Sequence, residues 1–125
     1  MSNEWNKLLS FGKIASIMSK CIDSIYGQEN NEDNYIIDDV SIIDDIIDIR
    51  VAIPDYFLII TFEPYEDSGV CELNIQVDNQ NDSCDRTILK KEFPLEVIND
   101  DHVVLYSKFL PVFKRILVNP LKNQI

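Results

Sequence analysis

The sequence predicts an α+β fold, in which a four-stranded antiparallel meander sheet carries a long N-terminal helix and a C-terminal helix packed on one face. Three observations lead to this prediction. Apolar residues recur at helical spacing at both ends of the chain, they alternate with polar residues through its middle, and the connections between strands are too short for a parallel return. With 125 residues and no stretch of linker composition, the chain is expected to form a single domain, 1–125.

The first predicted element is a helix from Trp5 to Tyr26. Its apolar residues follow the i, i+3, i+4 pattern of an amphipathic helix, and Gly27 is expected to end it. Gly12 lies inside this helix and weakens it by about 1 kcal/mol relative to Ala. The polar residues 28–34 are then expected to form a solvated loop.

The segment 35–46 has an ambiguous pattern, because the string Ile-Ile-Asp-Asp occurs in it twice. Helical spacing would put Asp38 and Asp45 opposite an apolar face, whereas strand alternation would put Asp38 on the same face as Ile42. We expect a short helix or an irregular turn up to about Ile46.

Four strands are predicted after this segment. Alternation of apolar and polar residues becomes clear at Ile47, and the run from Tyr56 to Phe62 is apolar on both faces, which is typical of a central strand. In the last strand, Thr87, Leu89 and Phe93 are expected to face inward. The four strands are predicted at residues 47–53, 56–62, 71–77 and 86–93.

The last predicted element is a helix over residues 102–118. Pro111 is expected to kink this helix or to split it in two, because proline lacks the amide hydrogen that the helix needs. Asp100 and Asp101 precede the helix, where carboxylates accept hydrogen bonds from its free N–H groups. This capping role is expected for them.

The distribution of charge is the most unusual property of the chain. Its net charge is −11, and the stretch from Asp23 to Asp85 holds seventeen acidic residues against one basic residue, Arg50. Such a surface is repelled by phosphates, which argues against binding to nucleic acid and to anionic membranes. Three cysteines without a CxxC pair, and an N-terminus unlike a signal peptide, favour a reducing compartment, so we expect a cytoplasmic protein.

Candidate catalytic and metal-binding groups are few. His102 follows Asp100 and Asp101, but no nucleophile motif accompanies it, so no catalytic residue and no enzyme activity are predicted. The pairs Asp38–Asp39 and Asp44–Asp45 offer oxygen ligands for Mg²⁺ or Ca²⁺, yet adjacent side chains diverge. The three cysteines fit no zinc-finger spacing, and Cys21 and Cys71 are expected in the core. No metal and no cofactor are predicted.

The acidic block has two interpretations. It forms a solvated face that keeps the protein in solution, or it forms a docking surface for a basic protein, in which interleaved isoleucines and Tyr35 anchor the contact. In the second case the partner-binding residues are Glu29, Glu32, Asp33, Tyr35, Asp38, Asp39, Asp44, Asp45, Asp48, Glu66 and Asp67.

In size, acidity, single-domain character and order of helices and strands, the whole chain resembles the immunity proteins encoded beside bacterial polymorphic toxins, including those of contact-dependent growth inhibition. The resemblance implies a cytoplasmic inhibitor that binds one cognate toxin domain, often a nuclease, and occludes its active site. It transfers no residue role. Two alternatives stay open: a nucleic-acid-mimic inhibitor of phage origin, and a non-inhibitory interaction subunit or secretion chaperone.

Overall fold

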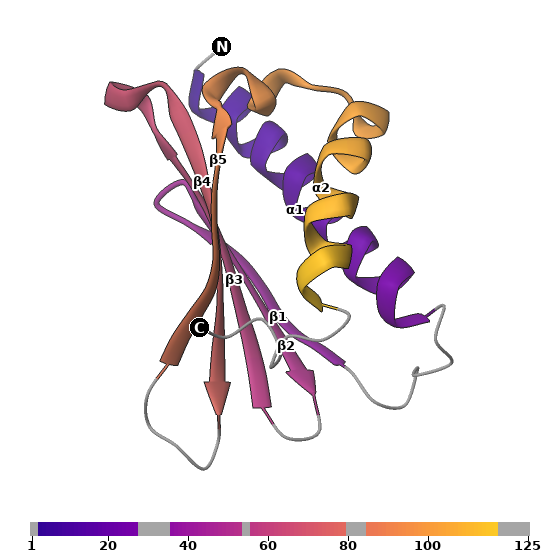
Figure 1. The fold of residues 1–125 in the computed structure, drawn as a ribbon. Helices are drawn as coiled ribbons and strands as arrows, with labels where there is room; N and C mark the ends of the chain where they lie inside the picture. The colour runs from indigo at the N-terminus through magenta and orange to yellow at the C-terminus, as the bar shows by residue number, and fades with distance from the viewer. Residues whose placement is uncertain (1–2, 28–35, 54–55, 80–84, 118–125) are drawn as a thin grey trace.

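The computed structural model describes residues 3–27, 36–53, 56–79 and 85–117. They form two layers, a sheet and a pair of long helices on one of its faces (Figure 1). The α+β class and the antiparallel meander are confirmed, with strand order β1-β2-β3-β4-β5, but the sheet has five strands where four were predicted. The elements are α1 (Asn3–Gly27), β1 (Ile36–Ile43), β2 (Ile46–Ile53), β3 (Tyr56–Tyr65), η2 (Glu66–Ser68), β4 (Val70–Asn79), β5 (Asp85–Pro94), η3 (Leu95–Asn99) and α2 (His102–Leu117).

The additional strand is β1, so the prediction of a short helix or irregular turn over 35–46 was wrong. Residues 36–43 pair antiparallel with β2, and only Asp44 and Asp45 stand between the two strands. This pairing gives hydrogen-bond partners to backbone N–H and C=O groups of β2, which would otherwise be unpaired at the edge of the sheet. The strand alternation of the isoleucines, with its period of two residues, is interrupted by a β-bulge at Asp38, which adds one unpaired residue between Ile37 and Asp39.

The inner face of the sheet supplies half of the core. Alternate residues of β2, β3 and β4 are fully buried there, as the sequence pattern predicted. Helix α1 contributes Phe11, Ile14 and Met18 to the same cluster, and its continuity across Gly12 agrees with the predicted long helix. The buried strand residues are Ile47, Ile49, Val51, Leu58, Ile60, Phe62, Cys71, Leu73, Ile75, Val77 and, on β5, Phe93.

Helix α2 closes the core through Phe109. This ring makes edge-to-face contacts with Phe62 and Phe93 at centroid distances of 5.8 and 5.1 Å, and it stacks on Phe113 at 6.2 Å. Pro111 lies on the exposed side of α2, which runs unbroken from His102 to Leu117, so the helix is not split.

The capping role predicted at the start of α2 is confirmed for Asp101, whereas Asp100 forms an ion pair instead. The backbone N–H of Val104 donates to Oδ1 of Asp101 at 2.9 Å, and Asp100 pairs with the ammonium of Lys108 at 2.5 Å. Both aspartates therefore have structural roles at the start of the helix.

The inward position predicted for Thr87 was wrong. A bulge at Ile88 shifts the register of β5, so that Leu89 pairs with Ile75 and Thr87 pairs with Gln76. Thr87 is exposed and shares the outer face with Gln76. A bulge of this kind cannot be read from alternation, because it adds one residue to the period of two.

No described helix covers the outer face of the sheet (Figure 1). The residues that share this face follow from the register of the four strand pairs. This open face and the connections at one of its ends hold the candidate functional residues that the structure describes.

Candidate protein-binding surface

The structure places the predicted partner-binding residues in three groups. Asp38 and Asp39 lie on β1, and Asp48 lies on β2. Asp44 and Asp45 form the β1–β2 turn, whereas Glu66 and Asp67 belong to η2, between β3 and β4. The other four predicted residues fall outside the described part of the chain: Glu29, Glu32, Asp33 and Tyr35.

The β1–β2 turn and η2 lie at the same end of the sheet. Because β2 and β3 are antiparallel, Ile47 at the start of β2 pairs with Phe62 near the end of β3. The turn that precedes β2 and the connection that follows β3 therefore emerge in the same direction (Figure 1). We call the four carboxylates carried by these two connections, Asp44, Asp45, Glu66 and Asp67, the acidic end.

The turn at Asp44–Asp45 has an uncommon backbone for aspartate. Both residues have positive φ angles, 54° and 64°, as a two-residue type I′ hairpin turn requires. Asn-Gly is the preferred sequence for this turn, because glycine adopts positive φ without a steric penalty. The chain instead places two exposed carboxylates side by side at this position.

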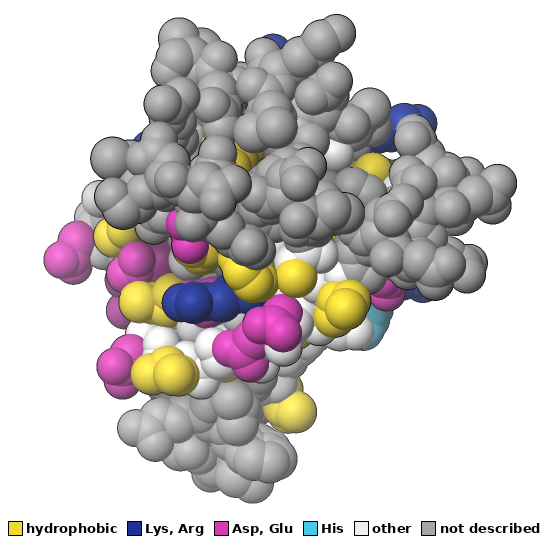
Figure 2. Space-filling view, turned by 90° about the horizontal axis from the view of Figure 1, so that it is seen from below, with side chains coloured by type: hydrophobic (Ala, Val, Ile, Leu, Met, Phe, Trp, Pro, Cys, Tyr) yellow, Lys and Arg dark blue, Asp and Glu magenta, His cyan; other side chains and the backbone are white. Residues whose placement is uncertain are grey.

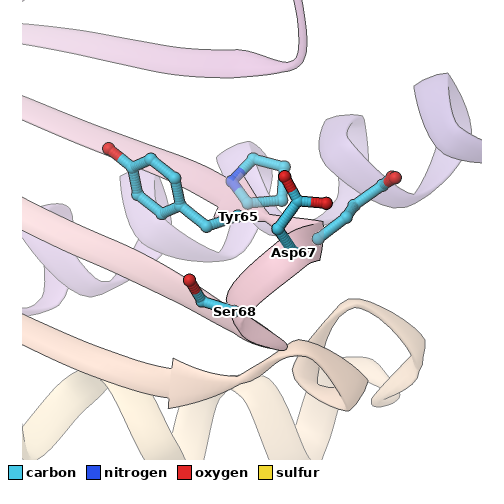
Figure 3. A pocket seen from close by; sticks show the side chains of 5 residues that line it. Tyr65, Asp67 and Ser68 are labelled. Carbon is cyan, nitrogen blue, oxygen red and sulfur yellow. The ribbon is translucent and has the colours of Figure 1, made fainter.

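A shallow pocket of about 430 Å³ adjoins η2 and is lined by residues 64–68. The side chains of Tyr65, Asp67 and Ser68 surround it (Figure 3). The hydroxyl of Tyr65 donates to Oε1 of Glu63 at 3.1 Å, and this hydrogen bond, together with desolvation and the charges of Glu63 and Glu72, raises the pKa of Tyr65. The surroundings of the phenol are therefore anionic and favour cations.

The sequence analysis missed a row of three glutamates on the open face. Glu63 of β3 pairs with Glu72 of β4, which in turn pairs with Glu92 of β5, so the three side chains lie next to one another across the strands. We call Glu63, Glu72 and Glu92 the glutamate row. Carboxylates about 6 Å apart repel by about 0.7 kcal/mol per pair even in water. The alternation of apolar and polar residues within each strand indicates that each glutamate lies on the outer face, but the register that aligns the three residues could not be read from the sequence.

Arg50 partly neutralises the β1–β2 half of the open face. It pairs across the strands with Asp39, and its Nε lies 3.5 Å from Oδ1 of Asp48. The side chains of Arg50 and Asp48 are 53% and 29% exposed, so this ion pair contributes at most about 1 kcal/mol. Asp39 and Asp48 are therefore less available to a cationic partner than the glutamate row.

Apolar side chains accompany the carboxylates. Ile43, at the end of β1, is 66% exposed and pairs with the half-buried Ile46, while Ile59 and Phe57 are half-buried on the open face of β3. The end of the molecule opposite η2 shows a different pattern, in which acidic, basic and hydrophobic side chains are mixed (Figure 2).

The described residues offer little for catalysis or metal binding. They include no group of three or more His, Cys, Asp and Glu side chains placed to hold a metal ion. Cys21 and Cys71 are buried as predicted, and burial raises their thiol pKa values to about 12 and about 11, so both stay protonated near neutral pH. Cys84 falls outside the described residues.

No model of a known protein family matches the chain, and comparison with curated proteins and with solved structures likewise found no match. Among the described residues, neither long helix has both the length and the apolar character needed to cross a bilayer.

Proposed function

We propose that this protein is an immunity-type inhibitor that binds a cognate toxin domain with nuclease activity and neutralises it through an acidic surface. The observation that carries the proposal is the position of the acidic end. Two connections far apart in the sequence bring Asp44 and Asp45 to the same end of the sheet as Glu66 and Asp67. The glutamate row adjoins them on the open face.

The electrostatics favour a basic protein as the partner. Among residues whose side chains the structure describes, the open face carries six acids and only two cations, Arg50 and Lys90. A concentrated negative field steers a cationic partner and raises association rates to about 10⁸ M⁻¹s⁻¹ or more at low salt. The six acids are Asp39, Asp48, Glu63, Glu72, Asp78 and Glu92.

Inhibition would follow from occlusion. A nuclease binds the phosphates of its substrate with Lys and Arg side chains, and carboxylates on a rigid sheet can pair with the same cations. The sheet holds the carboxylates in place, so less conformational entropy is lost on binding than with a flexible acidic tail. General resemblance to toxin immunity proteins, in size and acidity, supports the choice of a toxin as partner.

The test uses the protein encoded immediately upstream. The variant Asp44→Ser/Asp45→Ser/Glu66→Gln/Asp67→Asn should weaken binding to that protein by about 100-fold, because four contributions of about 0.7 kcal/mol each are lost. Co-expression with the parent chain should protect cells from its toxicity, and co-expression with the variant should not.

A control variant raises the net charge by two, half the change made by the acidic-end variant, at a site away from that surface. Asp23→Asn/Ser16→Lys raises the net charge on the exposed side of α1, away from the acidic end, and should leave affinity and protection unchanged. Equal affinity of the parent and the acidic-end variant, or an upstream protein that does not bind the parent at all, would contradict the proposal. An acidic inhibitor of a phage would instead be encoded in a prophage region and block restriction or guided nucleases.

A further inference from the structure

The outer face of the sheet carries an arrangement that the acidic end alone does not explain. The glutamate row crosses β3, β4 and β5 without a cation opposite any of its members. Carboxylates directly opposite one another lower the stability of a sheet, so the isolated protein is less stable for having this row. None of the three is within 4 Å of a cationic nitrogen of the described residues.

We infer that a protein partner seats a Lys- or Arg-bearing segment across this open face, with its cations over Glu63, Glu72 and Glu92. This inference rests on the proposed function and deepens it, because it moves the centre of the contact from the acidic end to the sheet. Neighbouring strands are about 4.8 Å apart, so the row spans about 10 Å. Two side chains at alternate positions of an extended segment are about 6.8 Å apart, so two cations of such a segment lie within that length.

Apolar side chains on the same face provide a second feature that the partner segment should complement. Ile43 is two-thirds exposed, and Ile46 beside it is half-buried at the same end of the sheet as the glutamate row. Burial of exposed apolar surface contributes affinity that screened charges do not. The partner segment should therefore carry apolar side chains that contact Ile43 and Ile46.

Two polar atoms in the adjacent row make no hydrogen bond within the described part of the chain. Oδ1 of Asn74 and Oδ1 of Asp48 are both shielded from solvent, and Oδ1 of Asp48 has only its ion pair with Nε of Arg50 at 3.5 Å. Both belong to the open face, where Thr61 lies between them in the register. A cationic segment that reaches the glutamate row brings N–H donors close to these acceptors.

A second copy of this chain fits the face poorly. Two copies, each with a net charge of −11, would bring one glutamate row against another. The two edges of the sheet differ as well, since β5 exposes Lys90 and Lys91, a common defence against edge-to-edge pairing. A basic partner relieves the repulsion that a second copy would increase.

The test maps the binding of a short synthetic peptide of alternating Lys and Leu by NMR, with a peptide of alternating Glu and Leu as control. Amide shifts of Glu63, Glu72, Glu92 and their neighbours should move with the Lys peptide only. Shifts confined to α1 and α2, shifts confined to the acidic end, or no shifts would overturn the inference. Concentration-dependent shifts of the open face without peptide would overturn it in favour of self-association.

Variants of the row make the test quantitative. Glu72→Gln/Glu92→Gln should weaken the Lys peptide about tenfold and raise Tm by about 3 °C, because the repulsion is removed. The matched control is Asp23→Asn/Ser16→Lys, which changes the charge by the same amount on the helix layer and should leave peptide affinity within twofold of the parent. A folded Gln variant with unchanged affinity would refute the inference.

The two proposals fail in different ways. If the upstream protein binds the parent chain and the Gln variant equally, but not the acidic-end variant, the proposed function stands and the open-face contact is wrong. If the peptide maps to the glutamate row but the upstream protein does not bind, the open face is a cation-binding surface and the toxin assignment is wrong.

Discussion

The turn between β1 and β2 should be replaceable by a sequence that makes the protein more stable and weakens binding to the proposed basic partner. The change is Asp44→Asn/Asp45→Gly, which installs the preferred type I′ sequence at residues with φ angles of 54° and 64°. Positive φ costs an ordinary residue roughly 1–2 kcal/mol, and Asp stands at the lower end of that range. The substitution should lower this conformational free-energy cost of the turn.

The expected gain follows from three contributions. Glycine at position 45 removes about 1 kcal/mol of backbone strain but loses about 0.5 kcal/mol to the greater freedom of the unfolded chain. Loss of the repulsion between adjacent carboxylates adds about 0.5 kcal/mol. The free energy of unfolding should therefore rise by about 1 kcal/mol, which corresponds to about 4 °C in Tm for a chain of this length.

Urea denaturation followed by circular dichroism measures this change as a higher midpoint at constant slope. The control Asp44→Ser/Asp45→Ser removes the same two charges without favouring positive φ, and its stability should be at or below that of the parent. Both variants should bind the upstream protein more weakly than the parent does. A lower midpoint for the Asn-Gly variant would refute the reasoning, since it would mean that the carboxylates stabilise the turn.

Three further outcomes are expected. Phe109→Ala should lower the free energy of unfolding by about 3–5 kcal/mol in chemical denaturation, because this fully buried ring contacts three other aromatic rings; a loss below 1 kcal/mol would contradict its central position. Asp101→Ala should cost about 1 kcal/mol through loss of the α2 cap, whereas Asp101→Asn or Asp101→Ser should restore most of it. The raised pKa values of Cys21 and Cys71, about 12 and about 11 against 9.0 for an exposed thiol, mean that the folded state holds its protons more tightly. The stability that this difference in pKa contributes is complete below pH 9 and is lost as pH rises from 9 toward those values. At pH 8 both thiols of the native protein should react with iodoacetamide far more slowly than they do in urea, a difference that mass spectrometry of the labelled chain would measure.

Part of the acidic surface was visible in the sequence and part was not. Asp44, Asp45, Glu66 and Asp67 were predicted as binding residues from local charge density, and the structure brings the two pairs to one end of the sheet. The sequence identified Arg50 as the one basic residue between Asp23 and Asp85, but only the tertiary structure shows that it pairs with Asp48. Charge density is a local property, whereas ion pairing depends on side-chain positions.

The errors in the predicted fold have one cause in common. The strand at 36–43 was missed because the bulge at Asp38 interrupts its alternation, and Thr87 was placed on the wrong face because a bulge lies at Ile88. A bulge inserts one extra residue into the two-residue period of a strand, so a prediction from alternation assigns the residues beyond the bulge to the wrong face.

The sequence by itself determined the α+β class, the long N-terminal helix, the inward faces of the three central strands and the cap on the last helix. Each of these depends on contacts between residues close in the chain or on a simple period. Only the tertiary structure decided the fifth strand and the alignment of Glu63, Glu72 and Glu92 across three strands. Register between strands is set by turn geometry and by packing against the helices, and neither is a property of any one segment of the chain.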